Sequence, residues 1–243
     1  MTEDLEKDPP ADSFETLDRQ LQLEMPELVR PELKTDPPAQ RISTAEPEPV
    51  DGTRSDAAEQ IIAEAWYVAF VLTGREDIVR RLLERYFPDV TVLIPRRTLR
   101  ERRRGKWKMV QKTVFPGYVF FKCALSNKLY FFIRRVNRVI RILEQERQPQ
   151  QVYEHEMQLI LKLTRGQDLI PLSRVHEVDG KVVVASGPLA GCEGMIIGAD
   201  RRKGRVKIRI MVGGESKVVD VGAEWIAEAG ETEKNKDQTV TAR

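Results

Sequence analysis

The sequence predicts an α+β protein with two folded domains behind an acidic tail, and three observations indicate this. Between residues 63 and 165, apolar runs of strand length alternate with amphipathic helical stretches, which is typical of a sheet with packed helices. Residues 178–229 contain short β-rich runs joined by glycine turns, a pattern typical of a small β-barrel. Residues 1–62 are rich in proline and acidic residues and have too few apolar residues for a core.

The first domain is expected to begin near residue 63 and to form a mixed sheet with helices on one face. Its predicted elements are a strand at 66–72, a helix at 75–87, a strand at 90–94, a basic hairpin at 96–112, a strand at 118–123, a helix near 126–132, a strand near 138–143 and a helix at about 153–164. In the first helix, Ile78, Leu82 and Leu83 fall on one face and arginines on the other.

A flexible linker is expected at residues 166–177, because Gly166, Pro171 and Ser173 interrupt any periodic pattern. The barrel that follows has predicted strands at 181–185, 194–199 and 205–212. Its second turn, Asp200–Arg205, is a hairpin tip that carries four cations. Residues 230–243 are polar, and we expect them to be a frayed tail.

The charge of the chain is distributed very unevenly, although its formal net charge is only +2. Residues 1–60 hold sixteen acidic and six basic side chains, whereas residues 66–143 hold nineteen Lys or Arg and five acidic residues. This asymmetry indicates a polyanionic partner for the folded part, and the tail could compete with nucleic acid for it. Within the tail, residues 13–23 have helical spacing and could fold transiently or on a partner, or remain solvated.

Motifs for catalysis and for metal binding are absent from the sequence. Cys123 and Cys192 form no CxxC pair and are expected to be buried free thiols, and His155 and His176 lie outside any ligand spacing. No zinc-protease, nucleophile-elbow or phosphate-loop pattern occurs. We therefore expect a protein that is not an enzyme and that uses no cofactor or metal. Without a signal peptide or a membrane-length apolar run, it is expected to be a cytoplasmic monomer with no membrane contact.

Two motifs in a fixed order carry a family resemblance. Trp66-Tyr67-Val68 opens the first domain, and Phe115-Pro116-Gly117-Tyr118-Val119 follows about fifty residues later. The segment Lys181–Ile210 resembles a KOW motif, with Gly191 at the position of its signature glycine. Over about residues 64–229, this order resembles the bacterial NusG family of transcription factors. The resemblance implies an NGN domain that binds the clamp helices of RNA polymerase and suppresses pausing, and a KOW barrel that recruits a second partner.

The same resemblance implies that Phe70, Phe115 and Tyr118 line an apolar concavity for the polymerase, where aromatic anchors concentrate binding energy. Each of them lies in or beside a strand, so core packing is the alternative. Phe115 is expected to be the best anchor, because the Phe-Pro-Gly turn can leave its ring exposed.

A basic cluster with an embedded tryptophan is the second candidate site. Its cations can neutralise phosphates, and the indole can stack on an exposed base. In the family, this side of the NGN domain faces the non-template DNA strand; a solvated basic hairpin is the alternative. The residues are Arg96, Arg97, Arg100, Arg102, Arg103, Arg104, Lys106, Trp107 and Lys108.

The basic segments also resemble the LoaP-type antiterminators of the family, which read a hairpin in the nascent RNA. Leu189 stands where the housekeeping factor commonly has a partner-facing aromatic, which weakens the expectation of a contact with Rho or ribosomal protein S10. A specialised antiterminator is the preferred interpretation; a housekeeping factor linked to Rho or S10, or a ribosome-associated KOW protein, is the alternative. The barrel cations that would bind folded RNA are Arg201, Arg202, Lys203, Arg205 and Lys207.

Overall fold

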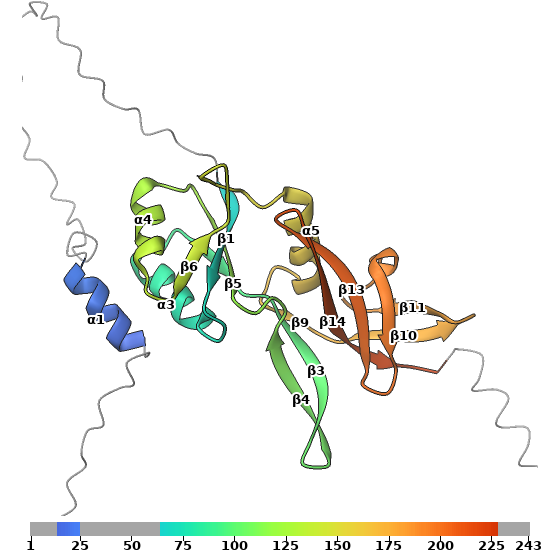
Figure 1. Ribbon diagram of the computed structural model, residues 1–243. Helices are drawn as coiled ribbons and strands as arrows, with labels where there is room; N and C mark the ends of the chain where they lie inside the picture. The colour runs from blue at the N-terminus through green and yellow to red at the C-terminus, as the bar shows by residue number, and fades with distance from the viewer. Residues whose placement is uncertain (1–13, 25–63, 228–243) are drawn as a thin grey trace, which may run out of the picture. The chain divides into compact units, whose positions relative to one another are not determined.

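The computed structural model describes residues 14–24 and 64–227 (Figure 1). Residues 14–24 form helix α1 (Phe14–Glu24), which favours the helical alternative over the solvated one, and they belong to a compact unit separate from the one that begins at Glu64. The rest of the predicted acidic tail and the predicted C-terminal tail lie outside the described residues. In the part of the chain that is described, no helix combines the length and hydrophobicity needed to cross a membrane.

The first domain is built on a four-stranded sheet with the strand order β2-β5-β1-β6. The strands are β1 (Ala65–Val71), β2 (Thr91–Leu93), β5 (Tyr118–Cys123) and β6 (Val139–Ile142). All three pairings are antiparallel, which corrects the prediction of a mixed sheet, while the predicted α+β fold class is confirmed. The antiparallel order arises because β1 lies between two strands that both run against it.

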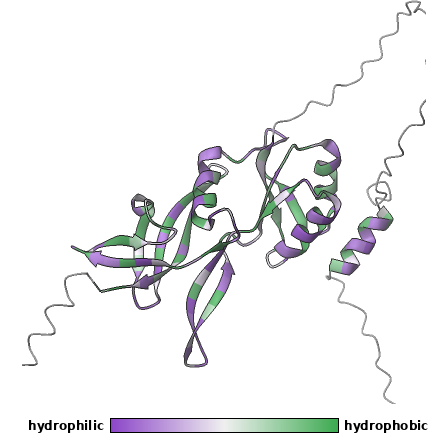
Figure 2. Cartoon of the chain, turned by 180° about the vertical axis from the view of Figure 1, so that it is seen from behind, coloured by the Kyte–Doolittle hydropathy of each residue, from purple (hydrophilic) through white to green (hydrophobic). Residues whose placement is uncertain are grey.

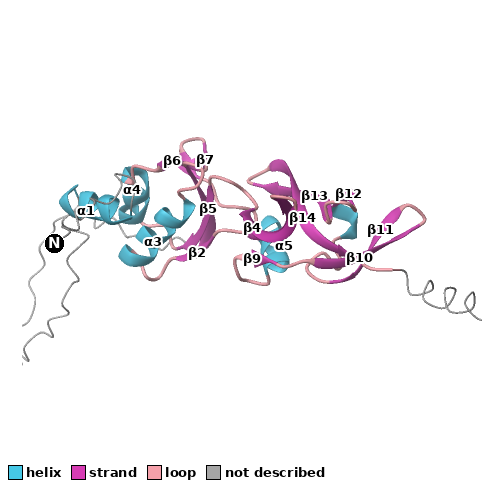
Figure 3. Cartoon of the chain, turned by 90° about the horizontal axis from the view of Figure 1, so that it is seen from below, coloured by secondary structure: helices cyan, strands magenta, loops and turns pink. Residues whose placement is uncertain are grey.

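Successive side chains of β1 point to opposite faces of the sheet and so belong to two different parts of the core. Tyr67 stacks on Phe121 with 5.7 Å between ring centroids, on the face that carries helices α3 (Glu76–Tyr86) and α4 (Asn127–Arg135) (Figure 3). The helices close this face through aromatic contacts, such as the 5.3 Å between the rings of Tyr86 and Phe132. Val68 belongs instead to the core cluster that continues into the barrel. The sheet is therefore buried on both faces, which accounts for the nearly continuous apolar runs of its strands.

A second, three-stranded sheet carries the basic hairpin, which we define as residues 96–113. It consists of β3 (Arg96–Arg103), β4 (Lys106–Thr113) and the short β9 (Leu169–Ile170). The hairpin prediction is confirmed, and its two-residue turn has positive φ at Arg104 (49°) and Gly105 (78°), as hairpin turns of this length favour. Figure 1 shows the hairpin projecting from the body of the domain. Between β6 and the barrel lie β7 (Glu144–Gln145), β8 (Gln148–Pro149) and α5 (Glu154–Thr164).

The barrel domain is a five-stranded sheet with the strand order β11-β10-β14-β13-β12. Its elements are β10 (Ser173–Val178), β11 (Lys181–Ser186), the short helix η1 (Glu193–Met195), β12 (Ile196–Asp200), β13 (Arg205–Val212) and β14 (Glu215–Trp225). Strict alternation makes β13 the clearest strand, since Val206, Ile208 and Ile210 are buried whereas Lys207 and Arg209 are exposed. Figure 2 shows the same alternation of hydrophobic and hydrophilic residues along the strands.

The segment predicted to be a flexible linker, residues 166–177, is instead ordered by contacts distant in sequence. It contains β9, which pairs in parallel with β3, and most of β10, so the barrel begins at Ser173 rather than at residue 178. Asp168 accepts two hydrogen bonds from Arg80, at 2.5 and 2.7 Å, and a third from the main-chain N–H of Ile94 at 3.1 Å. Local sequence does not reveal these partners, because they lie 74 and 88 residues away.

The barrel packs directly on the first domain, and we call this the closed arrangement. The carboxylate of Glu156 on α5 accepts hydrogen bonds from the main-chain N–H groups of Gly213 (2.6 Å) and Gly214 (3.0 Å) at the β13–β14 turn. Gly222 on β14 lies so close to β3 that a Cβ there would be 2.1 Å from the carbonyl oxygen of Thr98. A single core cluster runs from Val68 in β1 to the inward residues of β13.

Candidate nucleic-acid interface and aromatic face

Phe70 and Tyr118 form an aromatic pair at the end of the β1–β5 ladder, where they are directly opposite each other. Their rings meet edge to face, with 4.7 Å between centroids, and both side chains are half-buried. The guanidinium of Arg141 lies 4.7 Å from the Phe70 ring centroid, a distance typical of a cation–π contact. The structure thus brings these two predicted residues together as one aromatic surface.

Phe115 lies beneath this pair rather than on the surface, so the prediction of an exposed ring is wrong. Only 4% of the residue is exposed, and its ring packs 6.0 Å from Tyr118 and 5.8 Å from Phe120. The turn behaves as its sequence requires, since Gly117 has a φ of 81° and donates its N–H to the buried carboxylate of Glu76. The ring is nevertheless covered, because it belongs to the core cluster shared with the barrel.

Lys217 on β14 brings the barrel to the edge of the aromatic pair. Its ammonium lies 5.7 Å from the ring centroid of Tyr118. The carboxylate of Glu215, followed by the hydroxyl of Tyr118, raises the pKa of Lys217 above its ordinary value. In the closed arrangement, therefore, barrel residues occupy part of the surface next to Phe70 and Tyr118.

Most of the basic hairpin is exposed, as a nucleic-acid interface requires. Trp107 on β4 is 41% exposed, and the guanidinium of Arg100 lies 4.8 Å from its ring centroid. The Nε–H of Arg102 donates to the carbonyl oxygen of Gly105 at 3.2 Å, which shapes the tip. The exposed cations of the hairpin are Arg100, Arg102, Arg103, Arg104, Lys106 and Lys108.

Two of the predicted hairpin cations have other partners at its base. The guanidinium of Arg96 lies 2.5 Å from the carboxylate of Asp77 on α3. Arg97 is half-buried and donates to the main-chain carbonyl of Asp220 on β14. Burial lowers the pKa of Arg97, and the nearby Asp220 only partly opposes this. Arg96 and Arg97 therefore hold the hairpin to its neighbours rather than extending the exposed basic surface.

Leu189 faces the interior of the barrel, which corrects its assignment as a partner-facing residue. It is 0% exposed, and its main-chain N–H donates to the Ser173 hydroxyl at 3.1 Å. Gly187 places this turn tightly against β10, since a Cβ at that residue would lie 2.6 Å from the Cα of Ser173. Because the loop folds inward, the leucine fills the core.

The barrel cations are divided between the surface and the domain contact. Arg201, Arg202, Lys203 and Lys207 are exposed. Arg205 is mostly buried and lies 3.5 Å from Glu101 on the hairpin and 3.6 Å from Asp220. We call residues 200–205 the basic loop.

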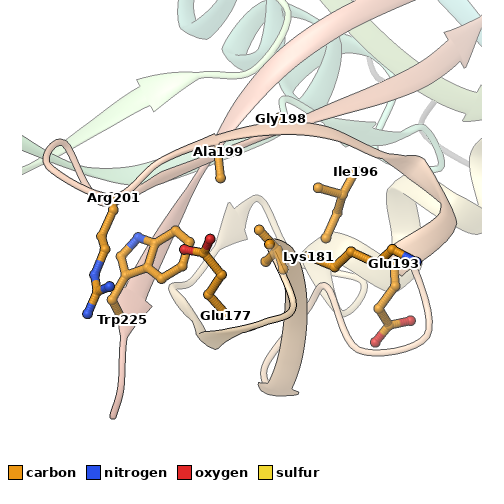
Figure 4. A pocket seen from close by; sticks show the side chains of 10 residues that line it. Glu177, Lys181, Glu193, Ile196, Gly198, Ala199, Arg201 and Trp225 are labelled. Carbon is orange, nitrogen blue, oxygen red and sulfur yellow. The ribbon is translucent and has the colours of Figure 1, made fainter. Parts of the chain in front are cut away.

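An open pocket of about 560 Å³ lies on the barrel beside the basic loop (Figure 4). Arg201 extends along Trp225 there, with 5.7 Å between its guanidinium and the ring centroid. Glu177, Lys181 and Glu193 give the lining both signs of charge. The pocket mixes acidic, basic and apolar groups and is therefore less suited to a polyanion than the hairpin.

The basic hairpin and the basic loop meet in a second cleft of about 420 Å³. Sequence reasoning treated them as two separate surfaces. The cleft is lined by Arg100, Glu101, Arg102, Trp107, Arg202, Lys203 and Arg205.

Glu101 is the residue of this cleft that the sequence reasoning missed. Its carboxylate contacts Lys112, Arg103 at 3.4 Å and Arg205 at 3.5 Å. The hydrogen bond from Lys112 is the main cause that holds the pKa of Glu101 below its ordinary value. The sequence did contain a signal for Glu101, since it is a lone acidic residue inside a run of cations. Such a residue reduces the repulsion among its neighbours.

Comparison with known proteins supports the assignment that the two motifs suggested. Residues 64–161 match the model of a protein family described as "Transcription termination factor nusG". The sheet domain of this chain belongs to the NusG family. The match covers the sheet domain through most of α5, including the whole basic hairpin.

Relatives with the name NusG align over about two thirds of this chain. The "Transcription termination/antitermination protein NusG" of Rickettsia felis is 26% identical over 164 residues, which cover 64% of this chain and 85% of the relative. The protein of the same name from Vibrio vulnificus is 27% identical over 180 residues, covering 70% and 94%. A structure titled "Domain interaction in Thermotoga maritima NusG" is 23% identical, covers 67% of this chain and 95% of that chain, and has a TM-score of 0.43.

Proposed function

We propose that this chain is a transcription termination/antitermination factor that binds RNA polymerase through the aromatic pair of its sheet domain. The family match over residues 64–161 is the observation that carries the proposal, because Phe70 and Tyr118 lie within it. Half-buried aromatic rings beside a cation are typical anchors of protein interfaces. The clamp helices of the polymerase are the proposed partner, and binding there suppresses pausing.

In this proposal, the closed arrangement limits access to the polymerase-binding face. Phe115 lies in a core shared with the barrel, and Lys217 borders the ring of Tyr118. A partner that uses the whole apolar surface therefore requires the barrel to move away. Such a movement breaks apolar contacts of the shared core as well as hydrogen bonds at its edge, including those of Glu156 and Arg97.

The basic hairpin is proposed to contact nucleic acid at the transcription bubble, with the non-template DNA strand as the nearest candidate. Its exposed cations can neutralise phosphates of either nucleic acid, and this contribution weakens as the salt concentration rises. Arg96 and Arg97 do not belong to this surface, because both have protein partners.

RNA-directed antitermination of the LoaP type is the role we propose for the barrel. The exposed cations Arg201, Arg202 and Lys203 support this, because folded RNA is bound largely through its phosphates. A housekeeping role with Rho or S10 is the second candidate, and the buried position of Leu189 removes the earlier argument against it. Binding of the full chain to a structured leader RNA, to Rho and to S10, each measured separately, distinguishes the two roles.

The polymerase contact is tested with purified core RNA polymerase and the full chain. We expect Phe70→Ala and Tyr118→Ala each to weaken binding roughly tenfold or more, as truncation of an interface anchor does. Phe131→Ala is the matched control, because this phenylalanine on α4 is 54% exposed and lies outside the aromatic pair. Equal affinity of the native chain and both variants would contradict the proposal. On a template with a defined pause site, the native chain should shorten the pause, and the two variants should not.

A further inference from the structure

The cleft between the basic hairpin and the basic loop joins residues that are about a hundred positions apart in the sequence. Arg102 and Trp107 come from the hairpin, and Arg202 and Lys203 come from the barrel. The closed arrangement is what brings them together, and Arg205 connects the two sides through Glu101. The cleft therefore exists only while the barrel is packed on the sheet domain.

The charges that line the cleft favour a polyanion. Five cations and one carboxylate form the lining, and the carboxylate is already bound by Lys112, Arg103 and Arg205. Lys203 lies 3.1 Å from Asp200, so its charge is partly compensated. Arg102 and Arg202 are both exposed, and within residues 14–24 and 64–227 no carboxylate lies within ion-pair distance of either. These two guanidinium groups, one from each side, are available for phosphates.

Trp107 gives the cleft a surface for a flat, unpaired ring. Its indole is 41% exposed, and Arg100 holds it through a cation–π contact of 4.8 Å. An aromatic ring in a cationic groove is typical of sites that bind single-stranded nucleic acid, because any base can stack on it. In a duplex the bases are already stacked within the helix, so a duplex offers only its phosphates to such a site.

We propose that this cleft binds one single strand of nucleic acid across both domains, with a base stacked on Trp107 and phosphates held by Arg102 and Arg202. The proposal goes beyond the contact at the transcription bubble proposed above, because it concerns the closed arrangement, and it does not depend on binding to polymerase. It assigns the hairpin and the loop to one site instead of two. The strand also stabilises the closed arrangement, because a ligand favours the conformation that it binds.

Fluorescence anisotropy of the full chain with short labelled oligonucleotides tests this site. A single-stranded RNA of about 12 nucleotides, the DNA strand of the same sequence and the corresponding duplex are compared over a salt series. We expect both single strands to bind more tightly than the duplex at moderate salt. The two single-strand arms show whether RNA or DNA is preferred. A duplex that binds as tightly as either strand would overturn the proposal.

Substitutions on the two sides of the cleft locate the binding. We expect Trp107→Ala and Arg202→Ala each to weaken single-strand binding about fivefold or more, since loss of one stacked base or one charge-assisted contact is of this order. Lys128→Ala is the control for loss of charge, because Lys128 is an exposed cation on α4 that lines neither side. If Trp107→Ala has no effect, or if all three variants lose affinity equally, the assigned cleft is wrong.

A substitution outside the cleft distinguishes one composite site from two independent patches. In Gly222→Ala the new methyl group meets the Thr98 carbonyl oxygen and the Leu172 side chain, so β14 must move away from β3. The φ of Gly222 lies outside the left-handed region, and alanine is compatible with its backbone. We expect this variant to lose single-strand affinity as strongly as Arg202→Ala, although no cationic or aromatic side chain is changed.

A second variant keeps the test decisive if Gly222→Ala does not fold. Glu156→Gln weakens the two hydrogen bonds at the Gly213–Gly214 turn, away from the cleft, and circular dichroism checks its fold. Reduced single-strand affinity of either folded variant supports the composite site. Unchanged affinity in a folded variant whose closed arrangement is disrupted would show two separate patches and overturn the proposal. Neither readout involves polymerase, so this failure is distinguishable from failure of the proposed function.

Discussion

Arg205 on the barrel and Glu101 on the hairpin lie 3.5 Å apart and connect the two basic elements of the molecule. Without the carboxylate, Arg205 would approach Arg103 and Lys112 with no opposite charge between them. Glu101 thus allows two positively charged elements to lie against each other. Its 18% side-chain exposure also means that solvent screens the attraction only partly.

The first prediction concerns Gly222 and polymerase binding. The Gly222→Ala variant should bind core RNA polymerase several-fold more tightly than the native chain, because displacing β14 exposes the surface around Tyr118 and Phe115. The gain equals the open fraction of the variant divided by the open fraction of the native chain. Surface plasmon resonance with immobilised polymerase measures it.

The control for this variant is Gly198→Ala, at a barrel glycine where an added Cβ meets nothing within 4 Å. It should leave the polymerase affinity unchanged. Weaker binding of Gly222→Ala than of the native chain would mean that the closed arrangement does not limit access to the aromatic face.

The second prediction is a pH dependence of stability that arises from Asp168. Burial alone would raise its pKa, but the hydrogen bonds from Arg80 and from the Ile94 N–H outweigh burial and hold the pKa below its ordinary value. A carboxyl group with a lowered folded-state pKa contributes stability above its unfolded pKa of about 4, and this contribution is lost as the pH falls through the folded-state pKa. The melting temperature of the native chain should therefore decrease below about pH 4.

The variant Asp168→Asn isolates this contribution. At pH 7 it should be less stable than the native chain by about 1 kcal/mol, because the ion pair with Arg80 becomes a hydrogen bond from the charged guanidinium to a neutral amide. Between pH 5 and pH 3, thermal unfolding should show a smaller pH dependence in the variant. Parallel pH curves for the two proteins would assign the acid sensitivity to other groups.

The third prediction uses two glycines that share a positive φ but differ in their surroundings. At Gly117 (φ 81°), a Cβ would lie 2.9 Å from the carbonyl oxygen of Val71, whereas at Gly166 (φ 71°) it would meet nothing within 4 Å. Gly166→Ala should therefore cost only the conformational strain of about 1 kcal/mol, and Gly117→Ala should cost more than this. Urea unfolding measures the difference, and equal losses would contradict the tight turn at Gly117.

The fourth prediction concerns the thiols. Burial, with a smaller effect of Glu64, raises the pKa of Cys123 to about 12, and Cys192 is only 3% exposed. Because the thiolate is the reactive form, neither residue should react with a disulfide reagent at pH 8 in the folded protein. Both should react in denaturant. Reaction of one thiol within minutes in native buffer would indicate that the part of the core around it opens readily.

The sequence predicted the elements whose signals are local. The strands at 118–123 and 205–212 have the predicted bounds, because the first is a continuous apolar run and the second alternates strictly. The hairpin followed from its Arg-Gly turn. In each case, the residues that define the element lie within it, so the chain reveals it without reference to its partners.

Predictions that depended on distant partners were wrong. Asp168 gives no sign in the sequence that it binds Arg80, and the segment around it was therefore interpreted as a flexible linker. Phe115 and Leu189 have surroundings in the sequence that permit exposure, but the packing of the barrel buries both. The sequence identified Phe70 and Tyr118 as candidate anchors. It could not show that their surface is partly covered, because the covering residue, Lys217, comes from β14.

The close approach of Gly222 to Thr98 has a thermodynamic consequence for a cell that contains both proposed ligands. The strand-binding cleft needs β14 against β3, whereas the full aromatic surface needs it elsewhere. Two ligands that require different conformations oppose each other without touching, and the antagonism is reciprocal by linkage. If free single strands lower the affinity for polymerase by a given factor, polymerase lowers the affinity for those strands by the same factor. Free transcripts would thus keep the chain bound in the closed arrangement, and the chain would leave them as polymerase becomes available.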